Sequence, residues 1–271
     1  MWTEHTIEAN GLSIHYRRTG TGTTPLVLAH GATDNGGCWG RVAHGLADHY
    51  AIYAPDARGH GQTSAPEGDY SSGTMAGDLA AFITTLGLDR PLVMGHSMGA
   101  NTTLALVAGW PDIARAAVLE DPVFRLDATA EHEIEARRAR MRADFERRQS
   151  ETHAEIIAAG KIANPSWHDD EFDAWADAKK RVAAAFLFAG PSASPFDWRG
   201  LLPTVRVPVL LVTPDAPPIG NGIVTAAAAE VARGLCPTLE VAHVAGAGHN
   251  IRRERFDAFM RAVSNFLATQ S

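Results

Sequence analysis

The stretch LVMGHSMGA, residues 92–100, places a serine between two glycines directly after a run of apolar residues. The apolar run predicts a buried strand, and the residues that follow predict a helix. A G-x-S-x-G sequence between a strand and a helix indicates a sharp turn, in which Gly95 and Gly99 leave room for close backbone approach. Such a turn exposes the oxygen of Ser97 at the strand end, where the helix N-terminus favours negative charge.

The composition of the chain is that of a globular protein with a sizeable core. Its 271 residues are 45% hydrophobic and 20% charged, so folding needs neither a metal nor a disulfide. The net charge of -7 argues against a nucleic-acid partner, and no apolar run approaches the roughly 18 residues of a membrane span. The first ten residues lack a signal-peptide pattern, and Cys38 and Cys236 are typical of free thiols in a reducing compartment. We therefore expect a cytoplasmic protein, and the sequence leaves a homodimer open.

Strand and helix patterns alternate along most of the chain. Residues 5–20 alternate apolar and polar side chains about an Asn-Gly pair, which predicts a β-hairpin. Apolar runs at 25–31, 91–97 and 207–215 predict buried strands, and helical patterns separate them. This order predicts an α/β fold with a mostly parallel sheet that is flanked by helices on both faces.

One charged segment interrupts this alternation. Residues 128–190 have a helical pattern with narrow apolar stripes and no strand signal. Narrow stripes are typical of helices that lie over another part of the protein and do not form the main core. We therefore expect a helical cap at 125–199, inserted after the sixth strand, and a core domain made of 1–124 and 200–271. The arginine-rich run at 137–148 within the cap is typical of a solvated helix face.

A serine hydroxyl is a weak nucleophile at neutral pH, so Ser97 needs a neighbouring base. His249 follows the last predicted strand in a glycine-rich loop, VAGAGHNIRRERF, and precedes the last helix. Its place far after the serine matches the chain order of hydrolases with this turn. His30, His60 and His96 each adjoin a glycine turn, and we expect them to hold loops through hydrogen bonds.

Six stretches together make the chain resemble an α/β-hydrolase over nearly its whole length: LVLAHGATDNGGCW, APDARGHGQTSAP, LVMGHSMGA, LEDP, PVLLVTPD and GAGHNIRRERF. The resemblance implies an α/β-hydrolase fold with a cap after the sixth strand, a Ser–His–acid triad and an oxyanion hole. It implies that the backbone N–H groups of Ala32 and Met98 form that hole and stabilise a tetrahedral intermediate. Serine at the turn distinguishes the chain from dehalogenases and epoxide hydrolases of this superfamily, which use an aspartate there.

Two carboxylates compete for the acid position of the triad. Similar enzymes carry the acid a few residues beyond the seventh strand, where Asp215 comes about two residues early and Pro214 replaces the usual glycine. Asp121 ends the predicted sixth strand, 24 residues after Ser97 (121 − 97). Some dehalogenase-like and zearalenone-lactonase-like members take the acid from that strand end, and Pro122 predicts an extended backbone at Asp121. We favour Asp121 and keep Asp215 as the alternative.

The sequence predicts a substrate class and implies no cofactor. Zinc-ligand spacings, a dinucleotide fingerprint and a phosphate loop are all missing from it. We expect a serine hydrolase for a small or medium hydrophobic ester or lactone, bound against the cap aromatics Trp167, Trp175, Phe186 and Trp198. Cofactor-free haloperoxidases, C–C hydrolases and lyases use the same triad and are alternatives, and a ligand-binding protein without turnover is the weakest alternative.

Overall fold

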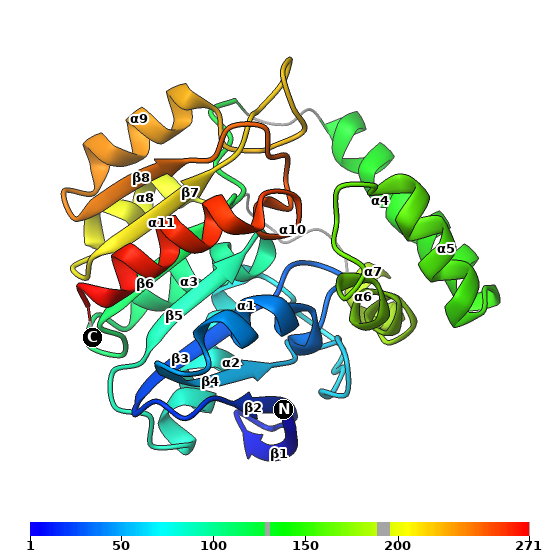
Figure 1. Ribbon diagram of the computed structural model, residues 1–271, viewed down its shortest axis with the longest axis horizontal. Coiled ribbons are helices and arrows are strands. Elements are labelled where there is room, and N and C mark those ends of the chain that lie inside the picture. The colour runs from blue at the N-terminus through cyan, green and yellow to red at the C-terminus, as the bar shows by residue number, and fades with distance from the viewer. Residues whose placement is uncertain (128–130, 189–195, 271) are drawn as a thin grey trace.

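One twisted sheet forms the centre of the protein, and the computed structural model describes residues 1–127, 131–188 and 196–270. Within these residues eight strands pair in the order β1-β2-β4-β3-β5-β6-β7-β8 (Figure 1). β2 is antiparallel to β1 and β4, and the other pairings are parallel, which confirms the predicted mostly parallel α/β sheet. The strands are β1 Thr3–Ala9, β2 Leu12–Thr19, β3 Thr24–Ala29, β4 Tyr50–Pro55, β5 Leu92–His96, β6 Ala116–Glu120, β7 Val209–Thr213 and β8 Leu239–His243.

Helices cover both faces of this sheet. On one face lie η1 (Gly36–Trp39), α1 (Gly40–Leu46) and α11 (Phe256–Ala268), and α10 (Ile251–Glu254) leads into α11. On the other face lie α2 (Ser72–Thr85), α3 (Met98–Gly109), α8 (Trp198–Leu201), η2 (Leu202–Thr204) and α9 (Ala226–Leu235). Successive side chains of a strand enter opposite cores, so Val93 packs towards α2 and α3 whereas Leu92 and Met94 pack towards α1 and α11. Strands buried on both faces explain the continuous apolar runs in the sequence.

Four helices between β6 and β7 form a lobe beside the sheet, at the right of Figure 1. They are α4 (Glu131–Ser150), α5 (His153–Ala163), α6 (Glu171–Lys180) and α7 (Ala184–Phe188). The lobe has a small apolar cluster of its own, in which Ile156, Phe172 and Trp175 are buried. We call these four helices the cap helices. The predicted cap at 125–199 also includes residues 128–130 and 189–195, which lie outside the described residues.

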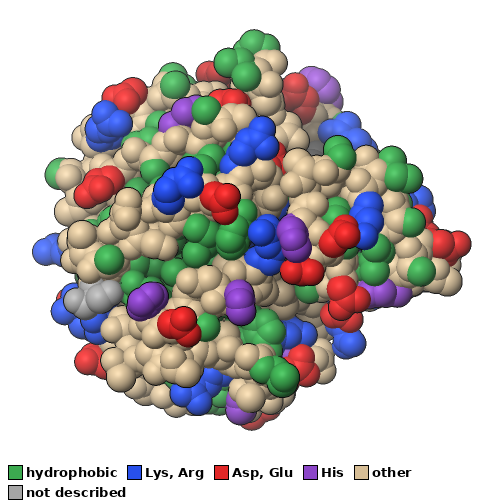
Figure 2. All heavy atoms as spheres, viewed as in Figure 1, with side chains coloured by type: hydrophobic (Ala, Val, Ile, Leu, Met, Phe, Trp, Pro, Cys, Tyr) green, Lys and Arg blue, Asp and Glu red, His purple; other side chains and the backbone are tan. Residues whose placement is uncertain are grey.

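The surface carries mixed charge. Acidic and basic side chains are interspersed over the face shown in Figure 2, on the sheet domain and on the cap helices alike. Ion pairs on the cap surface include Lys161 with Asp169 at 2.7 Å and Arg181 with Asp177 at 2.7 Å. Among the described helices, none combines the length and the hydropathy that crossing a membrane requires.

The turn at Ser97 depends on a very close approach of backbone segments. Ser97 has φ +51° and ψ −110°, a conformation that costs a residue with a side chain about 1–3 kcal/mol. A Cβ at Gly95 would overlap the carbonyl group of Gly99, and a Cβ at Gly99 would overlap the carbonyl oxygen of Ala29. The N–H of Ser97 donates to the carbonyl of Glu120 in β6 at 2.9 Å. The two glycines therefore let α3 begin directly after β5.

We predict that Gly99→Ala destabilises the fold by about 1–3 kcal/mol or more, because the overlapping atom is backbone and the neighbouring strand is fixed in the sheet. The free energy of unfolding from urea titrations measures this loss. Gly109→Ala in the same helix is the control, since a Cβ there meets nothing within 4 Å. Equal stability of the two variants would contradict the assigned role of the glycine.

Candidate active site

Three side chains from separate segments form a hydrogen-bonded row at one edge of the sheet. Ser97 Oγ lies 3.1 Å from His249 Nε2, and His249 Nδ1 lies 2.6 Å from Asp121 Oδ2. Ser97 follows β5, Asp121 follows β6 and His249 lies in the loop after β8. These strands run parallel, so the loops at their carboxyl ends meet at the same edge. With the Nδ1 proton directed at the carboxylate, Nε2 is free to accept the serine proton.

Asp121 is held in place by several hydrogen bonds. Its buried carboxylate accepts from the N–H of Ile223 at 3.0 Å and from the N–H of Val224 at 2.9 Å, besides facing His249. The extended backbone predicted from Pro122 is wrong, because Asp121 has φ +40°. Aspartate is one of the few residues that tolerate this left-handed region. The backbone therefore turns sharply at Asp121, directly after β6, and the carboxylate of this residue contacts His249.

Asp215, the alternative acid, contacts a different histidine, His243. Its carboxylate is 3.1 Å from Nε2 of His243 and accepts a hydrogen bond from the N–H of Gly246 at 2.8 Å. It therefore braces the turn after β8 that leads towards His249. The structure brings Asp121, and not Asp215, to the imidazole of His249.

The two backbone groups expected to form an oxyanion hole are available as donors. Met98 is the first residue of α3, so its N–H has no acceptor within the helix. The N–H of Ala32, in the loop after β3, donates to no acceptor among the described residues. Ala32 and Ser97 line the same cavity, and Met98 is the next residue in the chain.

The loop that carries Ala32 is held by a cap helix. The next residue, Thr33, has φ +61°, which is strained for a β-branched side chain. Lys179 at the end of α6 donates from Nζ to the carbonyl oxygen of Thr33 at 2.9 Å and to its Oγ1 at 2.7 Å. The N–H of Thr33 donates to Nε2 of His60 at 3.3 Å. The cap helices therefore hold the loop that contributes to the candidate site.

A buried cluster of charged side chains joins the cap helices to the core beside His249. Asp34 is central to it, because its carboxylate lies 3.3 Å from Lys179, 3.2 Å from Arg252 and 3.1 Å from Arg253. Burial alone would raise the pKa of Asp34, but the three cations hold that pKa well below its usual range. Sequence reasoning missed this cluster, because its members are up to 219 positions apart (253 − 34) and show no local pattern. Its six members are Asp34, Glu120, Glu171, Lys179, Arg252 and Arg253.

The other histidines near the site hold loops, as the sequence predicted. Nε2 of His30 accepts from the N–H of Ala57 at 2.9 Å, and burial lowers the pKa of His60 to about 3. His96 donates from Nε2 to the carbonyl oxygen of His249 at 2.9 Å, and burial lowers its pKa well below the usual value. His96 is therefore neutral and ties the loop of His249 to the serine turn.

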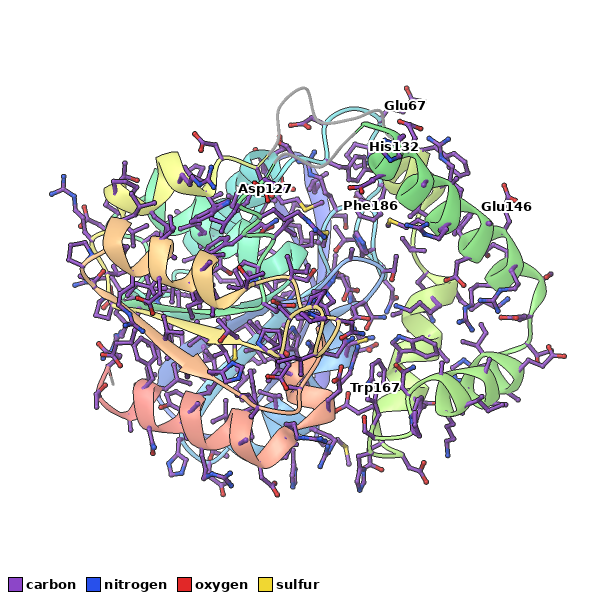
Figure 3. All side chains as sticks on the ribbon, turned by 90° about the horizontal axis from the view of Figure 1, so that it is seen from above. Glu67, Asp127, His132, Glu146, Trp167 and Phe186 are labelled. Atoms are coloured by element: carbon purple, nitrogen blue, oxygen red, sulfur yellow. The ribbon has the colours of Figure 1, made fainter. Side chains whose placement is uncertain are left out.

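A cavity of about 470 Å³ lies over Ser97 and His249, between the core and the cap helices. Trp167 and Trp175 line it, as the sequence predicted, and Figure 3 shows Trp167 on the cap side, facing the core. The lining is also strongly charged, so the expectation of a mainly hydrophobic pocket is wrong. The charged side chains that line it are Arg140, Arg148, Lys179, Arg253, Asp34 and Asp144.

Two aromatic side chains predicted to bind substrate lie outside this cavity. Trp198 stacks on Phe124 with ring centroids 4.7 Å apart, and its Nε1 donates to the carbonyl of Arg125. It is thus part of the core behind α3, because α8 returns the chain to the sheet domain. Phe186 packs on His60, with ring centroids 4.4 Å apart, and on Tyr70. It serves as a contact between α7 and the core.

The fold and the serine turn define a class of hydrolase-fold proteins, and comparison with known proteins identifies the family. A family model described as "Alpha/beta hydrolase family" matches residues 26–262, so the chain belongs to the alpha/beta hydrolase family. It is 30% identical over 267 residues to an N-formylmaleamate deformylase of Pseudomonas putida, covering 96% of this chain and 95% of that protein. It is 28% identical to a 2-(acetamidomethylene)succinate hydrolase of Mesorhizobium japonicum, covering 96% and 94%.

Solved structures show the same likeness. The crystal structure of an N-formylmaleamic acid deformylase from Pseudomonas putida S16 superposes with a TM-score of 0.76 at 25% identity, over 96% of this chain and 100% of that one. The two proteins therefore share the overall fold.

We predict that Asp34→Asn lowers the free energy of unfolding by about 3–5 kcal/mol near pH 7, because it leaves buried cations without their shared partner. The folded-state pKa of Asp34 is depressed, so its contribution is present above the unfolded pKa and is lost as pH falls below about 4. Urea unfolding between pH 3 and pH 7 measures the difference from the unmodified chain. A difference that stays constant over this range would contradict the assignment.

Proposed function

We propose that this chain is a serine hydrolase that transfers an acyl group of a small substrate to water through an acyl-enzyme. The proposal rests on one observation, the row in which Asp121 contacts His249 and His249 contacts Ser97. A serine becomes a good nucleophile when a base accepts its proton and a third group orients that base. Membership of a hydrolase family supports the same reading.

The reaction has two halves, acylation of Ser97 and hydrolysis of the acyl-enzyme, and the same three residues act in both. His249 accepts the proton of Ser97 while Oγ attacks the substrate carbonyl, and the N–H groups of Ala32 and Met98 stabilise the oxyanion. The protonated imidazole then donates its proton to the leaving atom, which departs and leaves the acyl group on Ser97. In the second half, His249 takes a proton from water, the hydroxide oxygen attacks the acyl carbon, and Ser97 recovers its proton. Asp121 keeps the Nδ1 proton in place throughout.

The bond cleaved is an amide or an ester. The sequence favoured an ester or a lactone, whereas the names of the two relatives, an N-formylmaleamate deformylase and a 2-(acetamidomethylene)succinate hydrolase, describe acids that carry an acylated nitrogen. An amine nitrogen that leaves without a proton, as an amide anion, is a poorer leaving group than an alkoxide, and a protonated His249 next to the leaving atom supplies the proton that an amide requires. We therefore include a short-chain amide beside the ester in the substrate class.

We predict that the unmodified chain hydrolyses p-nitrophenyl acetate or butyrate, or releases acetate from small N-acetyl amides, and that Ser97→Ala lowers kcat by on the order of 10³-fold or more. Release of p-nitrophenolate and of acetate gives the rates. A fluorophosphonate probe followed by mass spectrometry is expected to label Ser97. Equal rates for the two proteins on every substrate, with no labelling at Ser97, would exclude this function.

We predict that Asp121→Asn lowers kcat by about 10⁴-fold, because the amide group favours the wrong tautomer of His249. Asp215→Asn is the matched control, since this carboxylate contacts His243 instead. We expect that control to keep kcat within a few fold of the unmodified chain. If Asp215→Asn were the more damaging change, the assignment of the acid would be wrong.

A further inference from the structure

The cavity over Ser97 contains one buried guanidinium whose hydrogen-bonding capacity the protein leaves largely unused. Arg148 lines the cavity from α4, and its side chain is only 10% exposed. Within the part of the chain that the structure describes, its Nε is buried and has no hydrogen-bond partner. A buried charged group without a full set of partners costs free energy, and an anionic ligand in the cavity would offset that cost.

The acidic neighbours of Arg148 make only long contacts with it. Asp144 lies 3.6 Å from Nε, and Glu151 accepts a long hydrogen bond of 3.4 Å from Nη1. Both acids make their closer contacts with Arg147, which is 2.6 Å from Glu151 and half exposed. The two neighbouring arginines thus differ sharply, because Arg147 binds the acids at the surface while Arg148 turns towards the cavity.

The other buried cations that line the cavity are each neutralised by a close acidic partner. Lys179 donates to both oxygens of Thr33 and to Asp34. Arg253 donates to Glu171 and Asn250, and its other terminal nitrogen has no hydrogen-bond partner among the described residues but forms an ion pair with Asp34 at 3.1 Å. These two side chains hold the loops around the serine, whereas Arg148 has only long contacts with its acidic neighbours, at 3.4 and 3.6 Å.

The position of Arg148 suits recognition of a charged group rather than packing alone. Its guanidinium carbon lies over the ring of Trp175, 5.1 Å from the ring centroid, which is a cation–π contact. Arg140, which is exposed and lines the same cavity, lies on the same face of α4, two turns or about 12 Å away. The run of arginines is therefore not simply a solvated face, because α4 directs these two members into the cavity.

We propose that Arg148 is a carboxylate-binding residue, so that the substrate of this site is a small acid whose anionic group is bound by the cap while its acyl group faces Ser97. A planar guanidinium binds a carboxylate through two parallel hydrogen bonds, which fixes both position and orientation. The inference rests on the proposed function in one respect, because it takes the cavity over Ser97 as the substrate site.

The test is a binding measurement that needs no turnover. Succinate, a small dicarboxylate without a scissile bond, is titrated calorimetrically into the unmodified chain and compared with succinamide, its neutral analogue. We expect succinate to bind at least about tenfold more tightly, and Arg148→Met to weaken its binding about tenfold or more. Arg147→Met is the matched control, one residue away, and is expected to change the affinity less than about twofold.

The design separates a lost contact from a lost fold. Arg148→Lys keeps the charge but not the planar fork, so it is expected to fold and still to weaken succinate binding several-fold, and melting temperatures check all variants. Equal binding of succinate and succinamide, or equal effects at positions 147 and 148, would overturn the proposal. Arg148-dependent succinate binding without any hydrolysis would refute the proposed function alone, whereas Ser97-dependent hydrolysis with no preference for succinate would refute this inference alone.

Discussion

The strained turn at Ser97 is the constraint on which the rest of the site depends. A left-handed backbone at a serine is unfavourable, and it persists because β5, β6 and α3 hold the turn from three sides. The close packing of Gly95 and Gly99 leaves the side chain of Ser97 only the space above the sheet edge. Once that oxygen is placed, the parallel arrangement of the strands brings the loops of Asp121 and His249 to the same edge.

The cap helices do more than cover the site. Lys179 holds the strained Thr33 beside Ala32, and Asp34 links this lysine to the two arginines that follow the histidine loop. A buried ion cluster of this kind adds little net stability compared with apolar packing, but breaking it is costly. We therefore regard the cluster as a device for orientation, because it couples the cap, the Ala32 loop and the His249 loop in one rigid set of contacts.

The charge distribution of the cavity divides its cations by role. Lys179 and Arg253 bind acidic and carbonyl groups of the protein. Arg148 is buried against Trp175, and the acids near it bind Arg147 more closely. A site that only needed hydrophobic contact would gain nothing from such a group, since burying a charge that has only long contacts with acids is unfavourable. The proposed chemistry at Ser97 and the proposed binding of an anionic group by Arg148 thus concern one cavity.

The sequence by itself determined the features that depend on local pattern. Continuous apolar runs predicted the doubly buried strands, the glycines predicted the turn at Ser97, and chain order predicted that His249 would meet it. Asp121 was favoured over Asp215, but only its contact with His249 distinguished the two. Local pattern also misjudged Phe186 and Trp198, because aromatic residues of a core contact and of a pocket look alike in a sequence.

Only the tertiary structure decided what depends on contacts between distant segments. The charged cluster around Asp34 joins residues from four parts of the chain, and no periodic pattern in the sequence predicts it. The arginines of α4 are equivalent in sequence, and the packing of that helix against α6 decides which of them is buried. The physical reason is that the periodicity of a sequence shows only which face of a helix or strand is apolar. The partners of a buried charge depend on which distant segments the folded chain brings together.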